Sequence, residues 1–223
     1  MPYGSCCGFC GPAVPEAPPA EAASREAARR LFFALWPGEA MRQAMALATA
    51  EAVQASGGRP VSAANLHITL AFLGSVPERQ LPQLGTIARR AASPSGTDLT
   101  DLPLADEPRI ELAFDHLEYW RAAHLLCAVP AEPPARVAAL VRGLQALLTE
   151  GGFAPDLKPF RPHVTVVRKV SRPGRAKMHR VVWRFTELAL IESRTLAEGA
   201  LYSVVESYAL CSGTKAENNS ETP

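Results

Sequence analysis

The chain contains two similar stretches, Asn65-Leu-His-Ile-Thr-Leu70 and Arg161-Pro-His-Val-Thr-Val166, which lie far apart in a sequence of 223 residues. Both are short and β-rich, which is typical of strands. Side chains alternate between the two faces of a strand, so the histidine and threonine of each stretch should share one face. The residue between them then points into the core. The repeat indicates two related halves, each presenting an imidazole beside a hydroxyl group.

Strand-like and helix-like patterns alternate around these stretches. Apolar β-rich runs predict strands at 30–36, 67–73, 110–120, 124–129, 161–168, 182–191 and 201–210, the last two separated by a polar segment at 192–199. The short connection at 121–123 predicts an antiparallel hairpin. Helical spacing predicts helices over 41–52, over 81–87 after a capping box formed by Ser75 and Glu78, and over 137–148 between Pro133-Pro134 and Gly151-Gly152. We therefore expect an α+β fold.

Composition places the chain among folded globular proteins, because 48% of its residues are hydrophobic and 20% are charged. Residues 1–28 lack aliphatic periodicity, and we expect a disordered N-terminal tail there. We expect a single domain over 29–211 and a flexible C-terminal tail over 212–223. No apolar run reaches the roughly 20 residues of a membrane span, and no secretory signal is evident. A cytoplasmic monomer without membrane attachment is the resulting expectation.

The five cysteines do not form a disulfide pattern. Cys6, Cys7 and Cys10 are clustered in the tail, while Cys127 and Cys211 are isolated. No fourth cysteine or histidine lies near the cluster to complete a metal site. We expect reduced thiols.

Two histidines with two threonines suit the cleavage of a phosphodiester. The reaction needs a base for the attacking oxygen and an acid for the leaving oxygen, on opposite sides of phosphorus. With an ordinary pKa of about 6.5, one of His67 and His163 can be neutral while the other is protonated. The hydroxyl groups of Thr69 and Thr165 would hold the non-bridging oxygens and stabilise the developing negative charge.

Positive charge surrounds the second stretch. Although the whole chain has a net charge of +1, residues 157–186 contain no acidic residue. They contain nine basic residues, namely Lys158, Arg161, Arg168, Lys169, Arg172, Arg175, Lys177, Arg180 and Arg184. This asymmetry indicates an edge that meets an RNA or nucleotide backbone. Arg168, five residues beyond the histidine, could grip phosphate with its planar guanidinium.

The two His-x-Thr stretches also allow simpler interpretations. A single His-x-Thr occurs by chance in many strands, where the histidine is often a hydrogen-bonded core residue. Both histidines could instead bind a metal, but neither stretch has a carboxylate or a third histidine at ligand spacing. The remaining histidines, His116, His124 and His179, have no comparable setting, and we interpret them as structural or surface residues.

Longer segments resemble a known family. These are Arg30-Leu-Phe-Phe-Ala-Leu, Gly58-Arg-Pro-Val-Ser-Ala-Ala-Asn-Leu-His-Ile-Thr-Leu-Ala-Phe-Leu-Gly74, and Phe160-Arg-Pro-His-Val-Thr-Val-Val-Arg168. In order and spacing they resemble the bacterial and archaeal RNA 2′,3′-cyclic phosphodiesterases, also called 2′-5′ RNA ligase-like proteins, of the two-histidine phosphoesterase superfamily. The likeness runs from about 30 to 210. The tail, its cysteines and a Pro/Asp-rich segment at 97–109 depart from it.

The resemblance implies a bilobal α+β fold in which two antiparallel sheets form a central cleft with helices outside. It implies hydrolysis of RNA 2′,3′-cyclic phosphate ends to 2′-phosphomonoesters without metal or nucleotide cofactor, and possible 2′-5′ joining in reverse. At the positions that match the family motifs, the resemblance implies that His67 is the proton donor and His163 the proton acceptor. Thr69, Thr165 and Arg168 would bind the phosphate.

Two alternatives stay open at this point. The substrate could be a small cyclic nucleotide, or the chain could be a non-catalytic module that grips RNA ends. Phe72 and Tyr202 are candidates for stacking on a base, although we expect Phe72 to pack in the core.

Overall fold

The computed structural model describes residues 27–93, 110–132, 135–156, 158–174, 177–196 and 199–210. Some expectations therefore fall outside the described residues. They concern the N-terminal tail through residue 26 with its three cysteines, the whole Pro/Asp-rich segment at 97–109, Pro133-Pro134, Cys211 and the C-terminal tail. Within the described ranges, no helix is long and apolar enough to cross a membrane.

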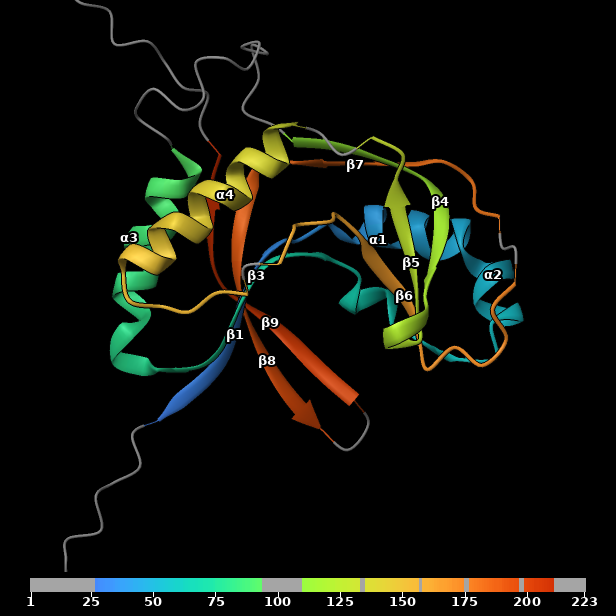
Figure 1. Ribbon diagram of the computed structural model, residues 1–223, viewed down its shortest axis with the longest axis horizontal. Helices are drawn as coiled ribbons and strands as arrows, with labels where there is room; N and C mark the ends of the chain where they lie inside the picture. The colour runs from blue at the N-terminus through green and yellow to red at the C-terminus, as the bar shows by residue number, and fades with distance from the viewer. Residues whose placement is uncertain are drawn as a thin grey trace, which may run out of the picture.

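Nine strands form two sheets in the part of the chain that is described (Figure 1). The first sheet has the order β3-β1-β8-β9, built from β3 (Ile68–Pro77), β1 (Ala28–Leu35), β8 (Glu187–Leu196) and β9 (Gly199–Ala209). The second sheet has the order β2-β6-β5-β4-β7, built from β2 (Arg59–Pro60), β6 (Val164–Arg168), β5 (Leu125–Pro130), β4 (Ile110–Trp120) and β7 (Val181–Phe185). Every strand pair is antiparallel.

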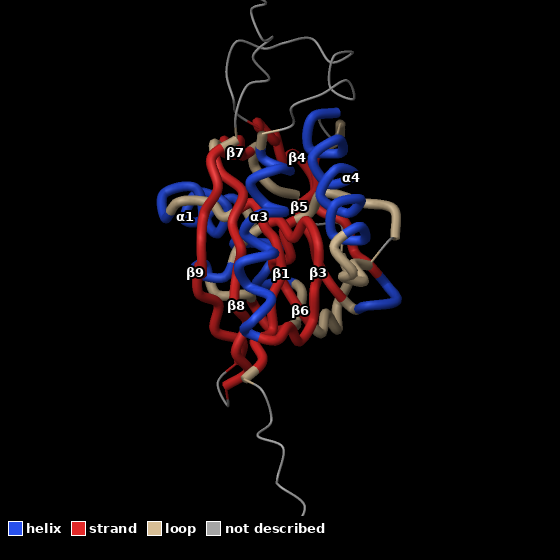
Figure 2. Tube along the Cα trace, turned by 90° about the vertical axis from the view of Figure 1, so that its left-hand side faces the viewer, coloured by secondary structure: helices blue, strands red, loops and turns tan. Residues whose placement is uncertain are grey.

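Helices cover the outer sides of the two sheets and divide the fold into two lobes. Helices α3 (Leu81–Ala92) and α4 (Ala135–Glu150) pack on the first sheet, and α1 (Glu39–Ala48) and α2 (Ala50–Ala55) accompany the second (Figures 1 and 2). The chain passes repeatedly between lobes, so each lobe is assembled from distant segments. This arrangement confirms the predicted bilobal α+β fold, with one histidine stretch beginning a strand of each sheet.

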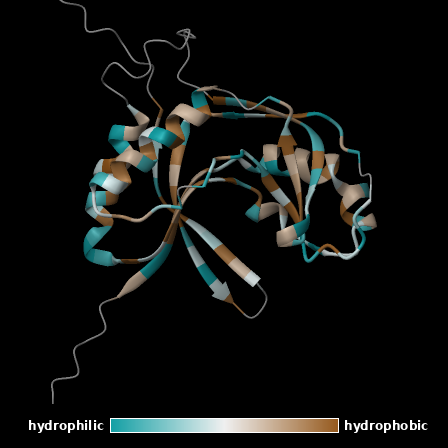
Figure 3. Ribbon diagram, viewed as in Figure 1, coloured by the Kyte–Doolittle hydropathy of each residue, from teal (hydrophilic) through white to brown (hydrophobic). Residues whose placement is uncertain are grey.

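Alternate residues of the strands pack into hydrophobic clusters on opposite faces of the first sheet. In the central strand β1, Leu31 to Leu35 are all buried. Leu31, Phe33 and Leu35 belong to the main core, whereas Phe32 and Ala34 join a smaller cluster on the opposite face. Hydrophobic residues concentrate in the strands, while α3 carries many hydrophilic residues outside its buried stripe (Figure 3). The first sheet therefore has apolar side chains on both faces.

Two strand expectations were wrong in detail. The run at 182–191 is not one strand, because the chain bends at Thr186 and passes from β7 of the second sheet into β8 of the first. The segment beginning at Glu192 is not a loop, because β8 continues to Leu196 and pairs with β9 down to Gly199. The chain around Thr186 and Glu192 lacks the Gly or Pro residues that mark such boundaries in a sequence.

The helix expectations also needed correction. The first helix is split into α1 and α2 at Thr49, whose hydroxyl donates to the carbonyl of Met45 at 2.9 Å. No capping box forms before α3, because Ser75 lies in β3 and the Glu78 carboxylate instead accepts from Arg29 at 2.7 Å. The last helix ends as predicted, with Gly152 in a left-handed conformation at φ 80°.

A close backbone approach at Gly58 holds β2 against β6. A methyl group there would lie 2.5 Å from Cγ1 of Val167 and 2.7 Å from the carbonyl oxygen of Arg168. We predict that Gly58→Ala lowers the free energy of unfolding by about 1–3 kcal/mol through overpacking, measured by chemical denaturation. The control Gly143→Ala, in α4 with no neighbour within 4 Å, should instead gain about 0.5–1 kcal/mol. A Gly58→Ala protein as stable as wild type would contradict this packing.

Candidate active site

The two histidine stretches have the same burial pattern. From residue 66 to 70 the side chains are buried, half-buried, buried, half-buried and buried, and residues 162 to 166 repeat this order. His67 and Thr69 are the half-buried pair of the first stretch, and His163 and Thr165 are that pair in the second. The structure thus confirms that imidazole and hydroxyl share a face while the residue between them enters the core.

A β-bulge in β6 brings Arg168 to the same face as the catalytic candidates. Thr165 pairs with Cys127 of β5 and Val167 pairs with Leu126, so Val166 is an extra residue without a partner in β5. A bulge shifts the alternation by one residue. Arg168, which strict alternation would send to the other face, therefore points to the side of His163 and Thr165.

The same bulge occurs in β3. Thr69 pairs with Ala34 and Ala71 pairs with Phe33, which leaves Leu70 as the extra residue. Phe72 consequently occupies the position that Arg168 has in the other half. It is 57% exposed, so the expectation that Phe72 packs in the core was wrong. The bulge, invisible in the sequence, turned it toward solvent.

Backbone carbonyl groups orient both imidazoles in the same way. Nδ1 of His67 lies 2.7 Å from the carbonyl oxygen of Asn65, and Nδ1 of His163 lies 2.8 Å from that of Arg161. A carbonyl oxygen can only accept, so Nδ1 carries a proton in each ring. In the neutral ring this leaves Nε2 as the basic nitrogen. Nε2 of His67 lies 3.1 Å from the Thr69 hydroxyl, which can donate to it.

Charges from the second lobe reach the histidine of the first. Burial lowers the pKa of His67 to about 4, and the positive charges of Arg168 and His163 lower it as well. Burial also lowers the pKa of His163, with Arg161 and Arg168 acting in the same direction. Arg168 therefore lowers the pKa of both imidazoles. Arg168, His67 and His163, all three predicted from the sequence, thus lie close enough for their charges to interact.

Aromatic rings enclose His67. Phe32 of β1, Trp36 after β1, and Tyr202 of β9 have centroids 5.1, 5.5 and 5.2 Å from the imidazole. Trp36 stacks on it at 28°, whereas Tyr202 meets it edge-on at 82°. Tyr202, a candidate for base stacking, thus contacts the imidazole directly. These apolar neighbours explain why burial is the main cause of the low pKa of His67.

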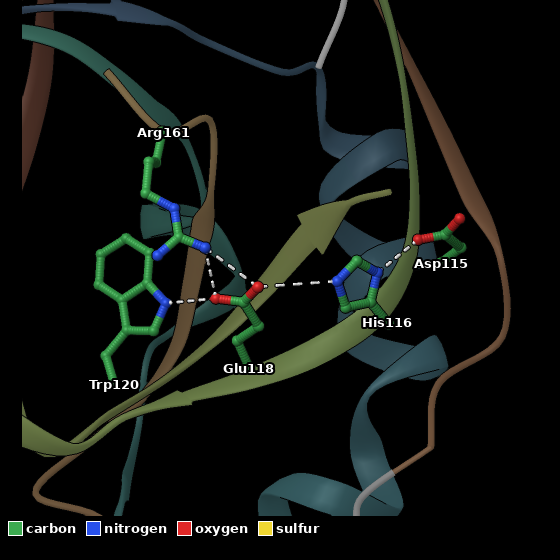
Figure 4. Close-up of polar contacts among 5 residues, drawn as sticks. All are labelled: Asp115, His116, Glu118, Trp120 and Arg161. Atoms are coloured by element: carbon green, nitrogen blue, oxygen red, sulfur yellow. Dashed lines mark hydrogen bonds and ion pairs between the residues drawn. The ribbon is translucent and has the colours of Figure 1, made fainter. Parts of the chain in front are cut away.

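A different network lies beside His163, and Figure 4 shows its polar contacts. The Trp120 ring lies 4.3 Å from the imidazole between centroids, and the Arg161 guanidinium lies 5.4 Å from the Trp120 ring centroid. Glu118 joins the two, because it accepts from Trp120 Nε1 at 2.9 Å and from Arg161 at 2.8 Å. His116 lies 3.8 Å from Glu118 and donates through Nδ1 to Asp115 at 2.7 Å. Glu118 therefore fixes two neighbours of His163.

Cys127 is the remaining reactive group on this face. Its sulfur lies 4.0 Å from the Thr165 hydroxyl. Burial raises the pKa of the thiol to about 12. The protonated thiol is a poor nucleophile, so Cys127 serves packing beside Thr165 rather than covalent chemistry.

Sequence reasoning missed the aromatic neighbours Trp36 and Trp120 and the carboxylate of Glu118. None of them lies in a repeated motif, so only the fold reveals their contacts. The interpretation of His116, His124 and His179 as structural or surface residues agrees with their exposure.

The protonation of the site can be measured directly. We predict that NMR titration of the imidazoles places the pKa of His67 near 4 and that of His163 below 6.5. Arg168→Met should raise both, because it removes a positive charge that disfavours the protonated rings. Inorganic phosphate should raise them too, since an anion favours imidazolium. If Arg168→Met leaves the titration of both rings unchanged, Arg168 does not lie near the two imidazoles as described.

Comparison with known proteins gives consistent results. A sequence profile of the 2′-5′ RNA ligase superfamily matches residues 39–196. The RNA 2′,3′-cyclic phosphodiesterase of Escherichia coli is 27% identical over 82% of this chain and 97% of its own length. The protein of that name from Thermus thermophilus is 30% identical over 81% of this chain and 90% of its own.

Solved structures agree in fold. The crystal structure of E. coli LigT complexed with 3′-AMP superposes with a TM-score of 0.69 at 25% identity, covering 82% of this chain and 99% of LigT. The profile match spans more than half of the chain, including both His-x-Thr stretches. The chain therefore belongs to the 2′-5′ RNA ligase superfamily.

Proposed function

We propose that the chain is an RNA 2′,3′-cyclic phosphodiesterase that opens the cyclic phosphate to a 2′-phosphomonoester by acid–base catalysis without a metal ion. The observation that carries the proposal is the pair of identically oriented imidazoles, one from each lobe, that share Arg168 as a charged neighbour. The names of the E. coli and T. thermophilus relatives support the same activity.

The two imidazoles can divide the reaction between them. Nε2 of His163 would take a proton from a water molecule as its oxygen attacks phosphorus. The bond from phosphorus to O3′ breaks, and O3′ takes the proton that Nε2 of His67 carries. One ring ends protonated and the other neutral, and exchange with solvent restores both. The Nδ1 hydrogen bonds keep each Nε2 pointed at the reacting oxygens throughout.

Substrate charge prepares His67 for the donor role. In the free protein the pKa of His67 is about 4, so the ring is neutral near pH 7. A bound phosphodiester anion offsets the positive charges of Arg168 and His163, and it thereby favours a proton on His67. The low pKa also makes the imidazolium a strong acid toward a leaving oxygen.

The remaining groups would stabilise the phosphorane-like transition state. Thr69 and Thr165 would donate to its non-bridging oxygens, and Arg168 would balance their growing charge. With a 5′-hydroxyl in place of water as the attacking group, the same opening of the ring at O3′ would join RNA ends through a 2′-5′ bond.

An oligonucleotide ending in a 2′,3′-cyclic phosphate tests the proposal. We predict turnover that persists in excess chelator, and losses of roughly 10²–10⁴-fold for His67→Ala and His163→Ala. His179→Ala, which removes an exposed histidine, is the matched control and should keep wild-type turnover. Binding without turnover would identify an RNA-end-binding module instead, and turnover that a chelator abolishes would contradict the metal-free mechanism.

A further inference from the structure

Four exposed basic residues lie in β2, at the end of β6 and in the loop that follows β6. We call Arg59, Arg168, Lys169 and Arg172 the cationic strip; all four are exposed. Only Arg168 belongs to the machinery proposed above. The proposed opening of the cyclic phosphate uses none of the other three, so they are available to bind another part of the substrate.

Strand register puts Arg59 on the active-site face. Arg59 of β2 is directly opposite Arg168 of β6, and Pro60 is opposite Val167. A further backbone hydrogen bond, from Val61 N to Val166 O at 2.9 Å, extends this pairing. Residues directly opposite each other in an antiparallel pair project to the same face. The two guanidinium groups therefore emerge side by side, and the β6 bulge has already turned Arg168 toward His163.

The loop after β6 is held rigidly. Lys169 has a left-handed backbone at φ 54°, which is uncommon for a residue other than glycine. The amides of Ser171 and Arg172 donate to Ser56 O at 3.2 and 2.9 Å. The Ser171 hydroxyl donates to Gly57 O at 2.9 Å. Such conformations persist only where surrounding contacts enforce them, and they concentrate at functional sites.

Arg172 lies over the turn that leads into β2. A methyl group at Gly57 would lie 2.7 Å from Nε of Arg172, so the guanidinium covers this glycine. Gly57 lies two residues before Arg59, so the Arg172 guanidinium lies beside the start of β2.

The charges of the strip are uncompensated. Among the described residues, no member of the strip has a carboxylate within ion-pair distance. Other basic residues of the stretch 157–186 do have one. Arg161 pairs with Glu118, Arg184 with Glu111 and Lys158 with Asp156, at 2.8 to 3.1 Å. Clustered positive charge without acidic partners is unfavourable unless an anion offsets it.

We propose that the cationic strip binds the phosphodiester backbone of an RNA chain, with Arg59 holding the phosphate that precedes the terminal cyclic phosphate. The inference rests on the proposed function and narrows its substrate to an oligonucleotide rather than a single cyclic nucleotide. A planar guanidinium suits a phosphate through two parallel hydrogen bonds. Side-by-side guanidiniums on paired strands suit neighbouring phosphates of one strand, one at the reaction centre and one beyond it.

Two substrates separate the strip from the catalytic centre. A 2′,3′-cyclic mononucleotide with a 5′-hydroxyl has one phosphate, whereas a tetranucleotide with the same end has additional internal phosphates. Arg59→Ala should lower kcat/KM for the tetranucleotide roughly tenfold, as expected for a lost charge-assisted hydrogen bond, mainly through KM. Turnover of the mononucleotide should stay within about twofold by the same reasoning, because it offers no second phosphate.

Salt dependence gives a second measurement. The slope of log kcat/KM for the tetranucleotide against log salt should become shallower by about 0.7 in Arg59→Ala. Arg59→Lys should keep the slope, because it keeps the charge. Arg142→Ala, which removes an exposed arginine from the outer helix α4, is the matched control and should leave both substrates and the slope unchanged.

Three results would overturn the inference. These are equal losses of kcat/KM on both substrates, no loss of kcat/KM on either substrate, or an unchanged salt slope for the tetranucleotide. If the wild type turns over neither substrate, the proposed function fails but the strip can still be tested. Fluorescence anisotropy with a labelled 3′-phosphorylated tetranucleotide should then show weaker binding by Arg59→Ala, and equal binding would reject the strip.

Discussion

The hydrogen bond from Nδ1 of each histidine to a backbone carbonyl is the constraint on which the site depends. It fixes the tautomer, so the nitrogen that can exchange a proton with substrate is Nε2 in both rings. The carbonyl groups belong to Asn65 and Arg161, which lie two residues before each histidine and just outside β3 and β6. The backbone just before each strand thus orients the imidazole, and the threonine follows on the same face.

The two halves share this backbone device but surround it differently. Around His67 the neighbours are Phe32, Trp36 and Tyr202, and the bulge presents the exposed ring of Phe72. Around His163 the same bulge presents Arg168, and acidic Glu118 restrains Trp120 and Arg161. One lobe therefore supplies apolar burial and a ring of the kind on which bases stack, and the other supplies positive charge. A nucleotide carries both a base and a phosphate, and this division matches it.

The sequence predicted much of this architecture because its signals are local. His-x-Thr, with a buried residue between, needs only the two-residue period of a strand, and the helix over 137–148 needs only its apolar spacing. The family resemblance supplied the bilobal pairing of the halves. The expectation for Phe72 failed because a bulge depends on which strand lies opposite. Likewise, the apolar run at 182–191 is divided between two sheets, with β7 in one and β8 in the other. Thr186, at the boundary, is not a residue type that marks a strand end in a sequence.

Other contacts of the site form only when strands that are distant in sequence become neighbours in a sheet. Trp120 and Glu118 reach His163 only because β4, β5 and β6 are adjacent, and Arg59 meets Arg168 only through the two-residue strand β2. The most direct measurement of the central claim is a crystal structure with a nucleoside 2′-monophosphate or a vanadate transition-state analogue. We predict one phosphorus or vanadium atom between Nε2 of His67 and Nε2 of His163, with Thr69 and Thr165 on its oxygens. A ligand that contacts a single histidine, or neither, would contradict the account.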